Sequence, residues 1–125
     1  MGQESYGYEL ILDLHGCNIS TFNRKSLTDY FKKLCEAIEM ERCDLHFWDD
    51  IYLPDGEEYT LPHLKGVSAV QFIMTSNITI HTLELLKTVF INIFSCKGFD
   101  KEVAQKITEE WFCSSDSNSL FIERN

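Results

Sequence analysis

Residues 66–96 read GVSAVQFIMTSNITIHTLELLKTVFINIFSC, and within this stretch the side chains repeatedly alternate between two faces. A repeat of two residues is typical of a β-strand, in which successive side chains point to opposite sides. The alternating segments are 66–74, 77–81 and 88–96. Thr75 and Ser76 fall at the junction of the first two segments. The stretch therefore predicts three successive strands.

Three further segments are predicted to be extended. Residues 8–14 alternate in the same way, residues 44–51 are rich in aromatic and other β-forming side chains, and residues 120–123 form a short final strand. Pro54-Asp55-Gly56 is a turn signal, because proline fixes φ and glycine leaves it free. We therefore expect a loop after the second of these strands.

Two amphipathic helices are predicted, one over residues 26–40 and one that begins after Asp100. Ser26 and Asp29, three residues apart, resemble a capping box. Apolar residues follow each cap at helical spacing: Leu27, Tyr30, Phe31, Leu34 and Ile38 in the first helix, and Val103, Ala104, Ile107 and Trp111 in the second. The serine-rich run 114–119 is predicted to end the second helix.

The order strand, helix, strands, helix, strand predicts an α+β fold. Its natural packing is a two-layer sandwich, in which an antiparallel β-sheet carries both helices on one face. The chain has 125 residues, which suits a single domain over 1–125, and 44% of its residues are hydrophobic, enough for a sizeable core.

The charge of the chain is strongly acidic, with 20 acidic and 11 basic residues and a formal net charge of -9. Such a chain repels phosphate backbones and anionic lipid surfaces, so we expect neither nucleic acid nor a membrane as a partner. The acidic stretch 36–58 is interpreted as a solvated surface. No apolar run approaches a membrane span, and residues 1–5 lack the pattern of a signal peptide, so a cytoplasmic location is predicted.

The five cysteines are odd in number and include no C-x-x-C pair, so they are interpreted as reduced thiols. Scattered histidines and cysteines match no metal-ligand spacing, and no metal site is predicted. Ser76 is followed five residues later by His81, a possible nucleophile and base. This spacing occurs by chance in many proteins, so by itself it favours a structural role.

Three segments together resemble the small prokaryotic S-adenosylmethionine decarboxylase family. They are Leu12-Asp13-Leu14-His15-Gly16-Cys17, Gly66-Val67-Ser68-Ala69-Val70, and Ser76-Asn77-Ile78-Thr79-Ile80-His81-Thr82 with Phe94-Ser95-Cys96. The resemblance is collinear and extends from about Gly7 to Glu123. It implies an enzyme of polyamine (spermidine) synthesis that is made as a self-cleaving proenzyme and that, as in that family, is expected to form a homodimer.

The resemblance also implies the cofactor and the site residues. The chain would be cut between Thr75 and Ser76, and Ser76 would become a pyruvoyl group that forms a Schiff base with the substrate amine. Ser68 matches the residue that stabilises the oxyanion, and His81 the base that removes the serine Cα proton. Cys96 matches the proton donor that completes decarboxylation.

The sequence departs from the family pattern around this site. Thr75 and Asn77 replace the usual glutamate and histidine that flank the serine, and Leu83-Glu84-Leu85 replaces Trp-Pro-Glu. Leu85 cannot accept the hydrogen bonds of the ribose hydroxyls, and Glu84 would point to the opposite face if the segment is extended.

The family's adenine-stacking aromatic residue is also missing from its usual place before Gly66, where Trp48, Tyr52 or Tyr59 are the candidates to replace it. The losses concern the nucleoside end of the substrate. Two alternatives therefore stay open: a decarboxylase of another amino acid such as arginine or ornithine, and an unprocessed regulatory homologue.

Overall fold

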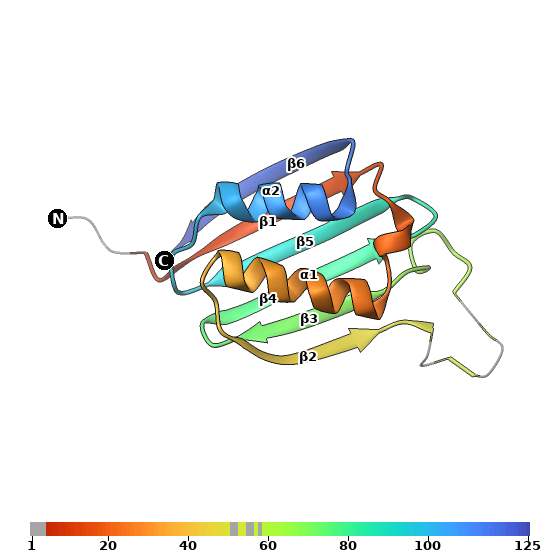
Figure 1. Ribbon diagram of the computed structural model, residues 1–125, viewed down its shortest axis with the longest axis horizontal. Helices are drawn as coiled ribbons and strands as arrows, with labels where there is room; N and C mark the ends of the chain where they lie inside the picture. The colour runs from red at the N-terminus through yellow and green to blue at the C-terminus, as the bar shows by residue number, and fades with distance from the viewer. Residues whose placement is uncertain (1–4, 51–52, 55–56, 58) are drawn as a thin grey trace.

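The computed structural model describes residues 5–50, 53–54, 57 and 59–125. Its elements, in chain order, are β1 (Gly7–His15), the 3-10 helix η1 (Ile19–Thr21), α1 (Arg24–Ala37), β2 (Arg42–Trp48), β3 (Ser68–Ile73), β4 (Ser76–Leu83), β5 (Thr88–Ser95), α2 (Lys101–Phe112) and β6 (Asp116–Arg124). The strands form one sheet in the order β2-β3-β4-β5-β1-β6, and every neighbouring pair is antiparallel (Figure 1).

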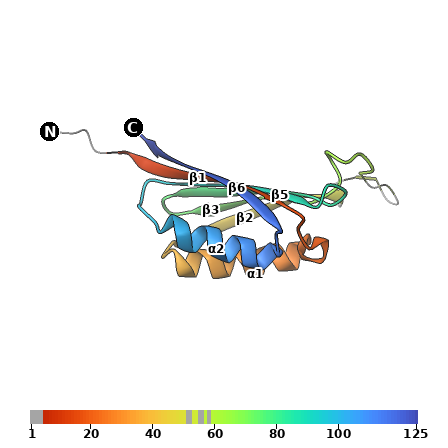
Figure 2. The ribbon, with the colours of Figure 1, turned by 90° about the horizontal axis from the view of Figure 1, so that it is seen from above.

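Both helices cover the same face of the sheet, and the other face is left open (Figure 2). The core lies between the two layers, where Leu12 of β1, Ile80 of β4 and Phe31 of α1 are fully buried. Burying such apolar side chains is the main force that holds the layers together. The predicted α+β two-layer sandwich is confirmed.

The alternation predicted from the sequence decides which side chains reach this core. On β5, Val89, Ile91 and Ile93 face the helices and are at most 2% exposed, whereas Phe90 lies on the open face and is 37% exposed. Alternation in a strand buries every second side chain when one face of the sheet is covered. The side chains that alternate with the buried ones along each strand therefore lie on the open face.

The structure corrects both helices in detail. α1 begins at Arg24, two residues earlier than predicted, because Asn23 is its N-cap and accepts the backbone N–H of Ser26 at 2.8 Å. The predicted capping box is thus wrong, and Asp29 instead pairs with Lys25 at 2.9 Å. In α2, Asp100 is the N-cap as predicted.

The buried stripe of α2 also differs from the prediction. Ala104, Thr108 and Phe112 are fully buried, whereas Val103 is 37% exposed. Ile107 and Trp111 pack against the core but remain partly accessible. The buried face of α2 is therefore rotated about the helix axis, relative to the predicted face, toward Tyr30 of α1. The Tyr30 hydroxyl lies 2.6 Å from Thr108 Oγ1.

All six strands have bounds that differ from the prediction, β1 and β5 by no more than one residue at an end. β2 spans Arg42–Trp48 instead of 44–51, and β4 extends over Ser76–Leu83 instead of a short piece. β3 is shorter than predicted, at Ser68–Ile73. β6 starts at Asp116, inside the serine-rich run, because this segment pairs with β1 as far as His15. The predicted turn residues Asp55 and Gly56 and the strand end Ile51 lie outside the described residues.

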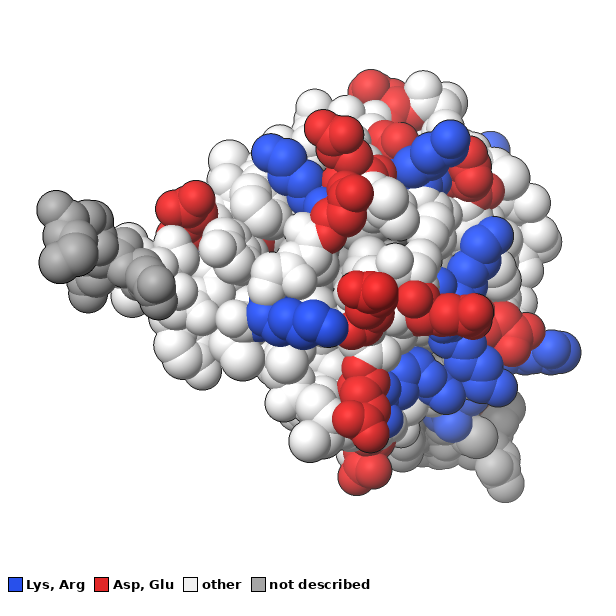
Figure 3. All heavy atoms as spheres, turned by 60° about the vertical axis from the view of Figure 1, so that its left-hand side comes forward, with Lys and Arg blue, Asp and Glu red and all other residues white. Residues whose placement is uncertain are grey.

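Charged side chains on the molecular surface are interspersed. Figure 3 shows acidic and basic residues side by side, with no extended patch of one sign on the face that is drawn. In the acidic stretch, Glu36, Glu39, Glu41 and Asp44 are exposed. Neither of the two described helices has the length and apolar character needed to span a membrane.

The hairpin between β3 and β4 positions the candidate site. Ile73 pairs with Ser76, so only Met74 and Thr75 form the turn. A two-residue turn fixes the register of an antiparallel pair. Ser68 and His81 both lie five residues from the Ile73–Ser76 pair, on opposite strands, and are therefore directly paired.

Candidate active site

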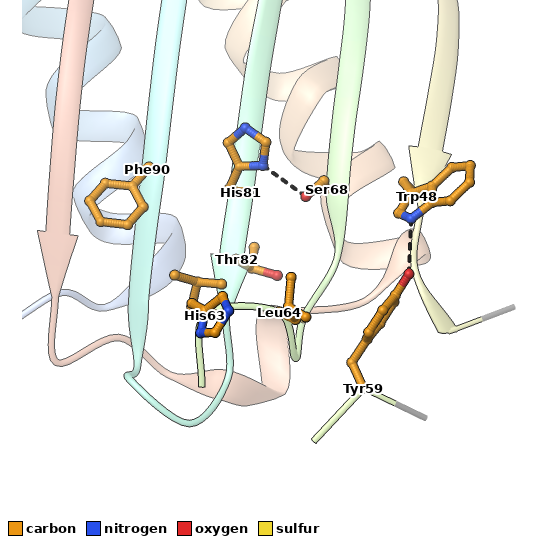
Figure 4. Close-up of a pocket in the computed structure, with 10 residues that line it drawn as sticks. Trp48, Tyr59, His63, Leu64, Ser68, His81, Thr82 and Phe90 are labelled. Atoms are coloured by element: carbon orange, nitrogen blue, oxygen red, sulfur yellow. Dashed lines mark hydrogen bonds between the residues drawn. The ribbon is translucent and has the colours of Figure 1, made fainter. Parts of the chain in front are cut away.

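The most specific polar contact on the open face joins Ser68 and His81. Ser68 Oγ lies 2.8 Å from His81 Nδ1, and the two residues are paired across β3 and β4 (Figure 4). The bond fixes the orientation of the imidazole ring, and the second ring nitrogen, Nε2, remains for a reacting group. Such an arrangement can act chemically as a base whose ring is oriented by a serine.

Two aromatic residues flank this pair in the same row of the sheet. Trp48 of β2 pairs with Ser68, and Phe90 of β5 pairs with His81. Paired residues of antiparallel strands share a face, so the four side chains lie across the open face in sequence. Trp48 is 58% exposed and offers a large apolar surface beside the polar pair.

A pocket of about 310 Å³ opens at this row (Figure 4). Its described lining residues are Trp48, Tyr59, His63, Leu64, Gly66, Ser68, His81, Thr82, Leu83 and Phe90. The indole Nε1 of Trp48 donates to the hydroxyl of Tyr59 at 3.2 Å, which connects β2 with the loop before β3. Two of the three aromatic candidates from the sequence therefore meet here, and the third, Tyr52, lies outside the described residues.

The second group of site residues lies at the hairpin. The backbone N–H of Cys96 donates to the carbonyl oxygen of Thr75 at 3.1 Å. Ser76 follows Thr75 as the first residue of β4, and Cys96 follows the last residue of β5. Because Ser76 pairs with Ser95, the predicted cleavage site and Cys96 are neighbours. The Cys96 N–H is a polarising donor that the sequence reasoning missed, since hydrogen bonds of a turn have no residue-type signal.

The structure does not bring these two groups together within one chain. Ser76 and His81 stand at opposite ends of β4, and a strand rises by about 3.3 Å per residue, so their Cα atoms are separated by about 16 Å. In Figure 1 the β3–β4 hairpin lies at the left end of the sheet, and the loop before β3 lies at the right end. Thr75, Ser76 and Cys96 thus form one cluster, and Ser68 and His81 form another.

The segment that replaces the family's Trp-Pro-Glu is not extended. β4 ends at Leu83, and a turn with Lys87 at positive φ follows. The backbone N–H of Glu84 donates to the carbonyl of Lys65 at 2.9 Å, and the Glu84 carboxylate lies 3.9 Å from Lys65 Nζ. Glu84 is therefore part of an ion pair, and Leu85 is 52% exposed.

The cysteines fall into two chemical classes. Burial raises the pKa of the Cys17 and Cys35 thiols from 9.0 to about 11. Cys43, Cys96 and Cys113 are exposed, and all five thiols are free. Since the thiolate is the reactive form, the raised pKa values of Cys17 and Cys35 favour a structural role for them, and Cys96 is the exposed cysteine that lies beside the hairpin. Among the described residues, no three His, Cys, Asp or Glu side chains are grouped to hold a metal ion.

Comparison with known proteins connects this geometry to a family. A family model described as S-adenosylmethionine decarboxylase matches residues 8–125. An S-adenosylmethionine decarboxylase proenzyme of Clostridium botulinum (strain Loch Maree / Type A3) is 32% identical over 96 residues, which are 75% of this chain and 72% of the relative. The corresponding proenzyme of Clostridium botulinum (strain 657 / Type Ba4) has the same identity and coverage.

A solved structure shares the fold. The crystal structure of the adenosylmethionine decarboxylase from Aquifex aeolicus VF5 matches with a TM-score of 0.74 at 14% sequence identity, and the match covers 98% of this chain and 93% of that chain. The similarity confirms the arrangement of the sheet and the two helices. The predicted family resemblance is confirmed by the sequence matches.

Proposed function

Because the chain belongs to the S-adenosylmethionine decarboxylase family, we propose that it is a self-cleaving proenzyme whose processed form decarboxylates S-adenosylmethionine for polyamine synthesis. The main supporting observation is the hydrogen bond of 3.1 Å from the Cys96 N–H to the Thr75 carbonyl oxygen, directly before Ser76. A donor on the carbonyl oxygen stabilises the charge that develops there during nucleophilic attack. The hairpin thus presents the peptide bond that is to be cut.

Processing would follow from attack by Ser76 on its own preceding peptide bond. The Ser76 Oγ forms a bond to the Thr75 carbonyl carbon, and the bond from that carbon to the Ser76 nitrogen breaks, which converts the amide into an ester. Removal of the Ser76 Cα proton then breaks the Cβ–Oγ bond and releases the Thr75 carboxylate. Water hydrolyses the remaining dehydroalanine to the pyruvoyl group and ammonia. The products are chains 1–75 and 76–125.

The residues present fit a pyruvoyl group at position 76. The group, once formed, withdraws electrons from the bond to the departing carboxylate. Cys96 lies beside position 76 and is exposed, which supports its assignment as the group that returns a proton to the substrate carbon. We assign His81 as the base that removes the Ser76 Cα proton and Ser68 as its orienting partner and oxyanion donor.

These assignments require a second copy of the chain. Along the strands of one chain, Ser76 lies about 16 Å and Cys96 about 20 Å from His81, too far for proton transfer. A two-fold axis that lies between two open sheet faces and runs across the strands would place the hairpin of one protomer over Ser68 and His81 of the other. We therefore propose a homodimer with two shared active sites.

The open face has the character of a surface that a second sheet covers. Trp48, Phe72 and Phe90 lie on it and are 58%, 43% and 37% exposed. Met74, at the tip of the cleavage hairpin, is 68% exposed. Sheets that pack face to face bury such alternating apolar side chains. The dimer would thus bring the two groups of site residues together and would also bury the exposed apolar side chains of the open face.

Mixed dimers test the shared site. A Ser76→Ala chain keeps Ser68 and His81, and a His81→Asn chain keeps Ser76 and Cys96. Coexpressed with distinguishable tags, the two variants are expected to form mixed dimers in which the His81→Asn chain, inactive alone, is cleaved. Cleavage of the Ser76→Ala partner is impossible and serves as the internal control. A mixed dimer that leaves both chains intact would contradict a site shared between protomers.

The pocket beside Ser68 and His81 favours an adenosyl group over a basic amino acid. Trp48, Tyr59 and Phe90 provide aromatic faces for a planar base, which stacking favours. The described lining residues of this pocket include no Asp or Glu to pair with a guanidinium or second ammonium group. This composition supports S-adenosylmethionine as the substrate. The cytoplasmic location stays a prediction from the sequence.

Release of labelled carbon dioxide tests the substrate. The processed protein is incubated with carboxyl-labelled S-adenosylmethionine, arginine or ornithine, and Ser76→Ala protein is the control. We expect release from S-adenosylmethionine only and none from the control. Release of carbon dioxide from arginine or ornithine, and not from S-adenosylmethionine, would show that the substrate is that amino acid. A processed protein that releases carbon dioxide from none of the three would contradict the proposed reaction.

A further inference from the structure

A directed chain of hydrogen bonds ends on the side chain of Thr75. The backbone N–H of Lys97 donates to Ser95 Oγ at 3.0 Å, and Ser95 Oγ donates to Thr75 Oγ1 at 2.8 Å. Thr75 Oγ1 in turn donates to the thioether sulfur of Met40 at 3.3 Å. The three bonds connect the end of β5, the cleavage hairpin and the segment after α1.

The direction of this chain follows from its two ends and from the distances to Met40. A backbone N–H only donates and a thioether only accepts, and each hydroxyl has a single proton to give. Thr75 Oγ1 lies 3.3 Å from the Met40 sulfur, whereas Ser95 Oγ lies 3.8 Å from it, so Thr75 donates to Met40 and the Ser95 proton is left for Thr75 Oγ1. Ser95 is fully buried and Met40 is 7% exposed, so water does not compete for these bonds.

Thr75 is consequently held at two points by consecutive residues. Its carbonyl oxygen accepts from the Cys96 N–H at 3.1 Å, and its side chain accepts from Ser95 Oγ. Two attachments on either side of the Thr75 Cα restrict rotation of its carbonyl group. Position 75 is also a point where this chain departs from the family's glutamate, so the side-chain attachment belongs to this chain's own hairpin.

We propose that Ser95 is a positioning residue for self-cleavage, which holds Thr75 so that its carbonyl carbon faces the Ser76 hydroxyl. The proposal rests on the proposed self-cleavage and adds a specific step: Ser95 acts in formation of the ester. It does not touch the reacting atoms, and it plays no part in the later removal of the Ser76 Cα proton. A carbonyl group that must be oriented for nucleophilic attack reacts more slowly when the hydrogen bond that orients it is lost.

The test follows cleavage of newly refolded protein by intact mass, with and without hydroxylamine, which cuts an accumulated ester at Thr75. Ser95→Ala is expected to slow cleavage roughly ten-fold, the effect of one lost neutral hydrogen bond on a rate. Hydroxylamine should release no additional fragment, because the slow step precedes the ester. Ser95→Thr keeps the hydroxyl and should restore the rate.

Two further variants separate positioning from folding. Thr75→Val removes the other hydroxyl of the pair while it keeps a β-branched shape, and it should slow ester formation by a similar factor. Thr108→Val removes a buried hydroxyl of α2, bonded to Tyr30, far from the hairpin, and should cleave at the unmodified rate despite its lower stability.

The outcomes separate this proposal from the one on which it rests. Cleavage of Ser95→Ala at the unmodified rate, a hydroxylamine-sensitive ester in Ser95→Ala, or equal slowing in Thr108→Val would each overturn the role of Ser95 while self-cleavage stands. Absence of cleavage in the unmodified chain, with no ester for hydroxylamine to cut, would overturn both.

Discussion

Ser68 and His81 face each other across β3 and β4, with Ser68 Oγ 2.8 Å from His81 Nδ1. The contact depends on the two-residue turn at Met74 and Thr75, because a turn one residue longer would shift His81 out of the pair. The same turn that carries the proposed cleavage site therefore also sets the geometry of the proposed base. Ser76 and His81 are linked through strand register, although they lie toward opposite ends of β4.

Replacement of His81 should stop processing at the ester. His81→Asn keeps a polar side chain of similar size but removes the base, so we expect cleavage to slow by about 10²-fold or more. The ester should accumulate and be cut by hydroxylamine, since attack by Ser76 does not need His81. Ser68→Ala should slow ester formation as well, because Ser68 is also assigned as the oxyanion donor, so less ester should accumulate than in His81→Asn. Slow cleavage of His81→Asn without any hydroxylamine-sensitive ester would place His81 in the first step.

The two processed chains should remain together after cleavage. β1 belongs to chain 1–75 but lies between β5 and β6 of chain 76–125, and β3 of the first chain pairs with β4 of the second. Their hydrogen bonds and the shared core persist when one peptide bond is cut. We expect both fragments to elute as one species in native gel filtration and to separate only in denaturant. Separation under native conditions would contradict this interleaved sheet.

Trp48 should contribute to substrate affinity more than to the chemical step. Stacking of a base on an aromatic side chain is worth on the order of 1–3 kcal/mol, so Trp48→Ala is expected to raise KM for S-adenosylmethionine about ten-fold or more. The kcat should change much less, and Trp48→Phe should retain most of the affinity. Val103→Ala, which alters an exposed residue of α2 in the helical layer, away from the open face and outside this pocket, is the matched control. An unchanged KM in Trp48→Ala would remove Trp48 from the substrate site.

The buried thiols should make the protein sensitive to alkaline pH. Burial raises the pKa of Cys17 and Cys35 from 9.0 to about 11, so the folded state holds protons that the unfolded state loses between these values. The free energy of unfolding is therefore expected to be unaffected below pH 9 and to fall as the pH rises toward 11. Urea unfolding at several pH values measures this fall, and Cys17→Ala with Cys35→Ala should reduce its slope. A slope unchanged in the double variant would assign the effect to other groups.

Most of the fold follows from periodicity. Alternation in residues 8–14 and 88–96 predicts the strands and their buried faces, because β1 and β5 are central strands covered on one side only. The start of α1 was missed because both Asn23 and Ser26 are residue types that favour the N-cap position. Asn23 is the N-cap in the structure, since its side chain accepts the Ser26 N–H. The start of β6 was missed because pairing with β1 extends the strand into residues of low β-propensity.

The candidate site was less accessible to sequence reasoning. The resemblance selected Ser68, Ser76, His81 and Cys96, and their roles stay predictions. The meeting of Trp48 with Tyr59 depends on the path of an irregular loop, which carries no periodic signal. The attachment of Thr75 to Ser95 joins residues twenty positions apart through side-chain geometry alone. Such contacts arise from tertiary structure and leave no pattern in the chain.

Intact mass of the purified protein under denaturing conditions tests the central claim most directly, with Ser76→Ala protein measured beside it. The account predicts two fragments that divide between Thr75 and Ser76, the second bearing a pyruvoyl group at its N-terminus, and a single intact chain in the Ser76→Ala control. A single species of 14.6 kDa from the unmodified chain after prolonged incubation would contradict self-cleavage. It would favour the unprocessed regulatory homologue instead.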